Sequence, residues 1–303
     1  MLNDKLKSYL FFHVIVLIWG FTAVLGALIS LDAIPLVWYR MLSACGFILI
    51  WILWKRKSLK LPPKKLRLLI IAGLVIALHW LTFFGAIKEA NVSITLALLS
   101  TGAFFTSILE PIFYKRKFVW YEVFFGLIVM LGLYIIFNVE TEHYLGIVLA
   151  LISAFLSAVF TLMNGKLVKH AAPSVISFYE LLTGAVAISI YLIIKTWITG
   201  GESGFNSEFF NLQSSDWLYL FILSSICTAF AFISAVAVMK HLSPYTVMLT
   251  TNLEPVYGII LAFLIFGNKE QMHPQFYYGT LIILSTVVLN GYLKTKRKIN
   301  KPS

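Results

Sequence analysis

The sequence predicts an all-α integral membrane protein whose ten transmembrane helices form two inverted five-helix repeats around a central cavity. Composition is the first indication. Hydrophobic residues make up 60% of the 303 residues and charged residues 12%, whereas a soluble protein is typically about half apolar and about a quarter charged. Mean hydropathy is +0.89. The second indication is a set of ten long apolar stretches. The third is a segment plan that occurs twice, since a constant shift of 152 positions superposes Lys88 on Lys240 and Lys117 on Lys269.

The apolar stretches are long enough to span a bilayer, because a helix needs about 20 residues to cross a hydrocarbon core of roughly 30 Å. The first stretch is too long for the core of a signal peptide and no small-residue cleavage site follows it, so we expect it to remain in the mature protein. Short alternating segments of the kind found in outer-membrane barrels are absent from the sequence. The ten expected spans are residues 9–29, 34–54, 68–87, 91–113, 119–138, 144–165, 173–196, 216–239, 244–266 and 274–293.

The duplication divides the chain into two units. The first repeat is expected to occupy residues 1–140, and the second, with a basic tail, residues 141–303. In each unit a Lys-containing junction precedes a long apolar run, at 84–91 in the first and 236–243 in the second. Because five is an odd number of crossings, the second unit enters the bilayer from the opposite side. This is the plan of an inverted-repeat transporter.

The distribution of Lys and Arg predicts the orientation, because cytoplasmic loops of membrane proteins are enriched in these residues. If the N-terminus lies inside, the outer side holds only Lys88, Lys195 and Lys269, and Arg40 lies within a span. We therefore expect a multi-pass protein of the inner (plasma) membrane with both termini in the cytoplasm. The other 20 basic residues then lie on the inner side: Lys5, Lys7, Lys55, Arg56, Lys57, Lys60, Lys64, Lys65, Arg67, Lys115, Arg116, Lys117, Lys166, Lys169, Lys240, Lys294, Lys296, Arg297, Lys298 and Lys301.

Several functional classes are disfavoured by the sequence. The net charge of +11 is explained by short inner loops and their attraction to anionic lipid, so nucleic-acid binding is not predicted. Cys45 and Cys227 lie inside expected spans, which favours packing roles over a disulfide. No Walker loop occurs, so ATP is not the direct energy source within this chain. The sequence motifs of zinc, aspartyl, serine and cysteine hydrolases are absent as well. We predict no enzyme activity, no cofactor and no metal site.

Several motifs resemble those of one transporter family. In their order and spacing they resemble the EamA family of the drug/metabolite transporter superfamily, and the resemblance extends over residues 10–293. The matching segments are 17–22 in the first span, Trp38-Tyr39-Arg40 in the second, 78–81 in the third, the junction of the fourth and fifth spans, and 253–257 followed by 264–267 in the ninth.

This resemblance implies ten helices in two inverted halves around a central cavity, alternating access, and export of small metabolites such as amino acids. One departure concerns the loops. The segment after the ninth span reads Gly267-Asn268-Lys269-Glu270, where the family usually has Gly-Glu, and the first half has Lys115-Arg116-Lys117 at the equivalent place.

Ionisable groups inside spans are costly, and each is therefore a candidate functional residue. Glu254 lies near the middle of the ninth span, and Pro255 after it removes a backbone donor, which frees a carbonyl near Thr251. Together with Asn252 and Tyr257, Glu254 forms a candidate site for a substrate ammonium group or a proton. The alternative is a glutamate that only bonds across helices to a neighbouring Ser or Tyr.

The third span contributes His79 and Trp80, and the first contributes Trp19, all at depths away from the interfaces. Histidine titrates near neutrality and can relay a proton. The aromatic rings can line a cavity or stack on a cationic or aromatic substrate. Packing without function is the alternative for each of the three.

Arg40 and Glu180 occupy matching places in the two halves, since a shift of 140 superposes 38–40 on 178–180. Inversion places Arg40 in the outer third and Glu180 in the inner third, so we do not expect them to pair. Arg40 is a candidate ligand for a substrate carboxylate, with helix packing and snorkelling as the alternative. Glu180 and Glu110 are candidate gate residues or members of structural ion pairs.

The leading interpretation is a secondary transporter that exports small amphipathic metabolites, most plausibly amino acids, with protons as a candidate coupling ion. Membrane lipids are the other expected partner. A monomer suffices in principle, and a loose homodimer is the alternative. A flippase for a lipid or lipid-linked headgroup is the competing function, and a lateral opening between spans would favour it.

Overall fold

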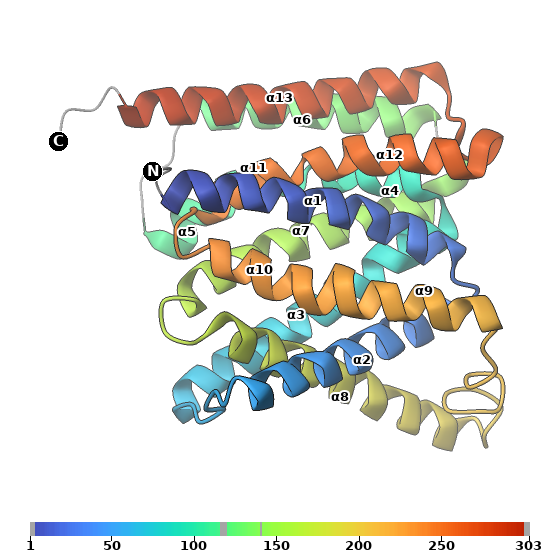
Figure 1. Cartoon of the computed structure of the whole chain (residues 1–303). Helices are drawn as coiled ribbons and strands as arrows, with labels where there is room; N and C mark the ends of the chain where they lie inside the picture. Colours follow the sequence, from blue (N-terminus) through green and yellow to red (C-terminus); the bar gives the residue numbers. More distant parts are fainter. Residues whose placement is uncertain (1–3, 116–119, 140, 300–303) are drawn as a thin grey trace.

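The computed structural model describes residues 4–115, 120–139 and 141–299, and within these residues the chain is helical and contains no strand. The predicted all-helical class is therefore confirmed. The elements, drawn in Figure 1, are α1 (Asp4–Leu28), α2 (Ala33–Trp54), α3 (Pro63–Glu89), α4 (Val92–Leu99), α5 (Gly102–Tyr114), α6 (Trp120–Val139), η1 (Thr141–His143), α7 (Tyr144–Leu167), α8 (Pro173–Ile198), α9 (Ser214–Ser224), η2 (Ser225–Phe230), α10 (Ala231–Val238), α11 (Pro244–Thr251), α12 (Leu253–Phe266), η3 (Gly267–Glu270) and α13 (Pro274–Ile299).

Most of the expected spans correspond to helical segments of sufficient length. Within the described residues, eight segments are long and apolar enough to cross a membrane, and they match the first four spans and the sixth to ninth. The fifth and tenth expected spans are also helical, as α6 and α13, but their apolar portions are shorter, Phe124–Ile136 and Pro274–Leu289. Multiple apolar helices thus make this a multi-pass membrane protein.

The first and the last described helix have their outer ends on the same side of the helical bundle. Helix α1 starts and helix α13 ends on this side, and the α2–α3, α7–α8 and α10–α11 connections lie there too (Figure 1). We call it the terminal side and the opposite one the far side. Lys57, Lys169 and Lys240 are exposed on terminal-side connections. Arg116, Lys117 and Lys301, which we also expect there, lie outside the described residues.

Three of the spanning segments depart from a continuous α-helix. The fourth is divided between α4 and α5 at Ser100 and Thr101, and the ninth is divided between α11 and α12 at Asn252. The eighth contains a π-helical turn, η2, between α9 and α10. The break at Asn252 has the cause that the sequence suggested, because Pro255 has no N–H to bond the Thr251 carbonyl.

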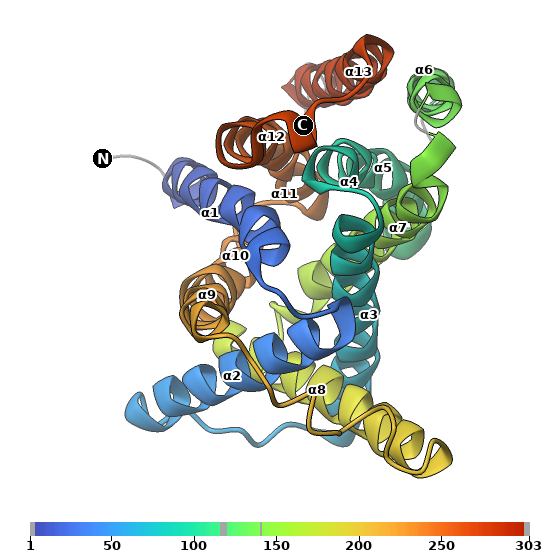
Figure 2. The same ribbon diagram turned by 90° about the vertical axis from the view of Figure 1, so that its right-hand side faces the viewer.

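Small residues let the helices cross closely, as is common in membrane proteins. Helix α3 crosses α8 at Gly73, where a Cβ would lie 2.6 Å from the Glu180 carbonyl oxygen. Helix α1 crosses α12 at Gly20 and Gly258, whose backbones lie against each other. Seen end-on, α2, α3 and α8 gather at one edge of the bundle and α6 and α13 at the opposite edge (Figure 2). The cavity described below lies between these groups, bordered by α1, α3, α7, α10 and α11.

Two buried carboxylates tie the connections together on the far side. Asp216, at the start of α9, accepts hydrogen bonds from the Ser30 N–H at 2.8 Å and the Ser30 hydroxyl at 2.6 Å. Glu270, in η3, accepts from the Val92 and Ser93 N–H groups at 3.0 and 2.9 Å, and so caps the N-terminus of α4 as a favourable anion. Each bond joins residues from opposite halves of the chain.

Gly73→Ala is expected to weaken the α3–α8 contact. The new Cβ would lie 2.6 Å from the Glu180 carbonyl oxygen and 3.0 Å from its Cα, and backbone atoms cannot rotate away. We expect a loss of about 1–3 kcal/mol, the usual cost of overpacking, seen as a lower unfolding temperature in detergent. Gly46→Ala is the matched control, because nothing lies within 4 Å of its added Cβ. Equal unfolding temperatures for the two variants would contradict this packing.

Candidate functional site

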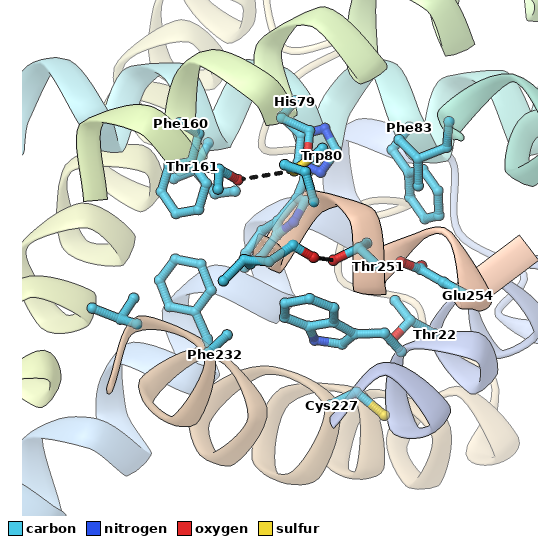
Figure 3. A pocket seen from close by; sticks show the side chains of 18 of the residues that line it. Thr22, His79, Trp80, Phe83, Phe160, Thr161, Cys227, Phe232, Thr251 and Glu254 are labelled. Carbon is cyan, nitrogen blue, oxygen red and sulfur yellow. Dashed lines mark hydrogen bonds between the residues drawn. The ribbon is translucent and has the colours of Figure 1, made fainter. Parts of the chain in front are cut away.

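A cavity lies among the helices of the bundle (Figure 3). Its volume is about 80 Å³, which is room for several water molecules, since one water needs about 10–15 Å³ of such space. Most of the wall is aromatic and aliphatic, and a few polar groups converge on it. The lining residues are Trp19, Thr22, Arg40, Ile76, His79, Trp80, Phe83, Leu99, Ser157, Phe160, Thr161, Cys227, Phe232, Ala235, Val236, Met239, Val247, Met248, Thr251 and Glu254.

Arg40 provides the positive charge of the cavity. Only 2% of the residue is exposed, so its guanidinium does not extend along the helix toward an interface. Its Cζ lies 3.8 Å from the centroid of the Trp80 ring, and the Phe84 ring lies 5.3 Å away. These aromatic faces stabilise the cation where water is scarce. Within the described residues its buried Nη1 has no hydrogen-bond partner, so this nitrogen has donors available to a ligand.

The π-helical turn η2 positions the acceptor for Arg40. The Arg40 Nε donates to the Thr228 hydroxyl at 2.7 Å. That hydroxyl in turn donates to the Leu223 carbonyl, five residues back, at 2.6 Å. Single π-turns inside α-helices are frequent at functional sites. Here the turn holds the Nε edge of the guanidinium in place and leaves Nη1 without a protein partner in the described residues.

Glu254 provides the negative charge. It is 6% exposed, lies at the start of α12, and lines the same cavity as Arg40. No salt bridge joins the two residues in the described part of the chain. Thr251, beside Glu254 in Figure 3, bonds back to the Val247 carbonyl at 3.0 Å. The cavity therefore contains one basic and one acidic side chain that are not joined by a salt bridge in the described residues.

His79 is held by the neighbouring helix α7. Its Nδ1 lies 2.9 Å from the Ser153 carbonyl oxygen and 2.8 Å from the Ser153 hydroxyl. A carbonyl oxygen can only accept, so Nδ1 carries the hydrogen in this contact, and a neutral ring then has Nε2 as its acceptor. The Phe83 ring lies beside it at 6.1 Å.

Aromatic rings form the opposite wall. Phe160 of α7 and Phe232 of α10 stack with centroids 5.4 Å apart at an angle of 14°. Phe232 also meets Trp80 edge-on at 5.8 Å. Figure 3 shows these rings across the cavity from Glu254. Such a wall suits the apolar part of a small amphipathic solute.

The structure brings some of the predicted residues together and leaves others apart. Glu254, His79, Trp80, Trp19 and Arg40 all line the one cavity. Asn252 and Tyr257 lie close by, at the helix break and against Gly20, but neither lines it. Glu110, near the terminal-side end of α5, and Glu180, on α8, are buried outside the lining. Arg40 and Glu180 are not joined. Within the described residues, no cluster of His, Cys, Asp or Glu could hold a metal ion.

Sequence reasoning missed several lining residues. Thr22, Thr161 and Cys227 contribute polar atoms or a thiol to the wall, and Thr228 holds Arg40. These residue types are ordinary in packed membrane helices. Thr251 was indicated by the sequence, because Pro255 frees a backbone carbonyl near it. Nothing in the sequence marks the π-turn that brings Thr228 to Arg40.

A multi-pass helical bundle with a small interior cavity of polar and aromatic walls defines a class, the α-helical membrane proteins. The EamA-like transporter family matches residues 6–138 and 144–292. The chain belongs to this family, which is part of the drug/metabolite transporter superfamily. The family points to a transporter and not to an enzyme.

Individual relatives agree with this assignment. A protein of Archaeoglobus fulgidus, named an uncharacterized transporter, is 25% identical over 295 residues, which cover 93% of this chain and 96% of the relative. Another uncharacterized transporter, from Clostridium kluyveri, is 23% identical over 247 residues, or 78% of this chain and 75% of the relative. A crystal structure of a further protein aligns with a TM-score of 0.66 at 14% identity, over 97% of this chain and 99% of that one. That likeness shows a shared fold.

The two cysteines should report on the cavity. Cys227 lines it, whereas Cys45 lies outside the lining with its Sγ 4.0 Å from the Phe178 carbonyl. We expect a small thiol reagent to label Cys227 several times faster than Cys45, as measured by mass spectrometry of the protein in detergent. Cys227→Ser should remove the fast labelling and Cys45→Ser should keep it. Labelling of Cys45 at the same rate would argue against an accessible cavity at Cys227.

Proposed function

We propose that the protein is a secondary transporter that exports small zwitterionic metabolites, amino acids above all, across the inner membrane by alternating access. The observation that carries the substrate class is the separation of charge in the cavity. Arg40 has an unbonded Nη1, and the buried carboxyl group of Glu254 lines the same cavity. An α-amino acid has one carboxylate and one ammonium group, which complement these two.

In this proposal the substrate carboxylate binds the Arg40 guanidinium, since arginine donates to carboxylates with matching planar geometry. The substrate ammonium binds Glu254. The bound zwitterion then neutralises both buried charges at once, which a neutral solute cannot do. The Phe160–Phe232 pair and Trp80 offer apolar contact for the substrate side chain.

The arrangement of helices supports ten spans in two inverted repeats, residues 1–140 and 141–303. Exchanging the halves turns α1 into α7, α2 into α8, α3 into α9–α10, and α6 into α13. Equivalent contacts occur on both sides of this exchange: α3 packs on α7 as α10 packs on α1, and α5 packs on α7 as α12 packs on α1. The pairs α2–α8 and α6–α13 map onto themselves. A two-fold relation of this kind is the basis of alternating access in inverted-repeat transporters.

The ties at the bundle ends support a conformation that is closed on the far side. There the Asp216 and Glu270 carboxylates are buried and bond to backbone N–H groups. On the terminal side, the bonds between the two halves come from lysine and tyrosine side chains. They include Lys57 to the Ser174 hydroxyl at 3.4 Å, Lys65 to the His170 carbonyl at 3.5 Å, Lys166 to the Phe113 carbonyl at 2.7 Å and the Tyr179 hydroxyl to the Leu59 carbonyl at 2.9 Å. With the terminal side in the cytoplasm, as the basic residues predict, the cavity loads for export when that side opens.

Glu254→Gln is expected to lower amino-acid counterflow in proteoliposomes by about tenfold or more, because a charge-assisted hydrogen bond contributes about 1.5–3 kcal/mol and 1.4 kcal/mol is a factor of ten. Glu142→Gln is the matched control, since Glu142 is exposed on η1. An amino-acid methyl ester, which lacks the carboxylate, should be a poor substrate of the wild type.

Wild-type counterflow in Glu254→Gln would overturn the role of Glu254. Absence of counterflow for every amino acid tested, with scrambling of labelled lipid in the same vesicles, would favour the flippase function instead.

Asp216→Ala is expected to open the far side more often, because it removes the acceptor of both Ser30 bonds. Asp32→Ala is the matched control on the same connection, since Asp32 is exposed and its side chain makes no capping bond. In vesicles of known orientation, a membrane-impermeant thiol reagent applied from the far side should label Cys227 faster in Asp216→Ala than in Asp32→Ala. Equal rates would show that this tie does not hold the far side closed.

A further inference from the structure

A second polar pair lies outside the cavity, between α7 and α8. Glu180 and Asn164 are both fully buried, each with 0% exposure. Both carboxyl oxygens of Glu180 and both polar side-chain atoms of Asn164 have no hydrogen-bond partner within the described residues. The Asn164 amide is nevertheless the side chain that interacts with the Glu180 carboxyl. Four orphaned polar atoms facing one another inside a membrane protein require an explanation, because each costs free energy when unpaired.

No cation compensates Glu180. In the described part of the chain no salt bridge reaches it, which differs from the structural ion pair that we considered from the sequence. Helix α10 contributes no titratable residue and α3 contributes Gly73 at the contact. Three charged or titratable groups on the surrounding helices form hydrogen bonds with other residues, and Arg67 is exposed. The bonds are Arg40 to the Thr228 hydroxyl, Cys45 to the Phe178 carbonyl and Lys166 to the Phe113 carbonyl.

The polar atoms become complementary when a proton is added. A protonated carboxyl group has one O–H donor and one C=O acceptor, and an asparagine amide has N–H donors and one C=O acceptor. The two groups can then exchange a pair of hydrogen bonds, O–H to Asn164 Oδ1 and Nδ2–H to the Glu180 carbonyl oxygen. An ionised carboxylate can only accept, so it can take one hydrogen bond from Asn164 Nδ2–H but leaves Asn164 Oδ1 without a donor.

The pair lies next to the substrate cavity on the terminal side. Asn164 is three residues beyond Thr161 on α7, and Gly73, which contacts Glu180, is three residues before Ile76 on α3. Thr161 and Ile76 both line the cavity. Residues three apart lie on the same helix face, about 4.5 Å along the axis. Any opening of the cavity toward the terminal side therefore passes close to Glu180.

We propose that Glu180 and Asn164 form a proton-binding site, in which the Glu180 carboxyl carries a proton while the terminal side is closed around it and releases the proton to water when that side opens. The role in transport rests on the proposed function, whereas the binding of the proton does not. Loss of the proton leaves a carboxylate that must be hydrated, so deprotonation favours the conformation open to the terminal side.

Proton occupancy can be measured directly on the purified protein by infrared difference spectroscopy. We expect the wild-type spectrum at neutral pH to contain the C=O stretch of a protonated carboxyl group that shifts in D₂O and is missing in Glu180→Gln. Asn164→Leu, which has similar volume but no amide, should shift the band. A wild-type spectrum without any band that depends on Glu180 would overturn the proposal.

Coupling to conformation can be measured without any substrate, through labelling of Cys227 from the terminal side. Because the thiol of Cys227 titrates in both proteins, its effect on labelling cancels when the wild-type rate is divided by the Glu180→Gln rate. This ratio should rise with pH, by up to about tenfold per pH unit where the site titrates, as linkage of one proton requires. Glu142→Gln, used in place of wild type, should give the same rise. A ratio independent of pH would overturn the coupling.

The transport measurement separates this proposal from the function itself. If wild type shows no counterflow of amino acids, the proposed function fails while the infrared and labelling results still stand. If counterflow occurs, Glu180→Gln should keep it and lose uptake driven by an imposed pH gradient. Gradient-driven uptake at the wild-type rate in Glu180→Gln, or loss of counterflow together with uptake, would exclude Glu180 as the coupling site.

Discussion

Every backbone N–H and C=O group inside a bilayer must find a partner in the protein, because hydrocarbon offers none. This constraint keeps the described spans helical and limits where the helices can be interrupted. The interruptions at Thr101, Asn252 and η2 all adjoin residues that border the cavity. Hydroxyl groups compensate nearby: Thr101 bonds to the Leu98 carbonyl and Thr228 to that of Leu223. Within the described spans, these interruptions therefore lie next to the cavity.

The central cavity handles charge differently from the bundle ends. At the far side, Asp216 and Glu270 are satisfied by backbone N–H groups, so these carboxylates serve as stable ties. In the cavity, Arg40 is only partly satisfied, by Thr228 and the face of Trp80, and Glu254 lies opposite without pairing to it. Removing two ions from water and leaving them apart is unfavourable for stability. The proposed function supplies the reason for such a site, because a bound zwitterion would satisfy both groups.

Much of the architecture was predictable from the sequence, because hydropathy and segment length decide where helices cross a membrane. Five cavity residues were also predictable, since ionisable groups and deep aromatic residues are conspicuous in apolar helices. The contact of Arg40 with Thr228 could not be predicted, because it depends on the π-helical turn η2, and no sequence pattern marks that turn. The same is true of Asn164, an unremarked amide whose significance arises only from its burial against Glu180. Substrate binding by these residues is a prediction that rests on the chemistry of their side chains and not on their spacing in the sequence.

The cap that Glu270 places on α4 has a consequence for how the chain is made. The Val92 and Ser93 N–H groups precede their acceptor by 178 and 177 positions. A ribosome therefore completes nearly the entire polypeptide before this end of α4 receives its partner. Until then these donors depend on water or lipid headgroups at the bilayer surface. The first repeat is therefore present in the membrane before the α4 N-terminus has its protein acceptor. Assembly of the two halves is thereby linked to the last stage of synthesis, and truncation before Glu270 removes a bond from a helix encoded far upstream.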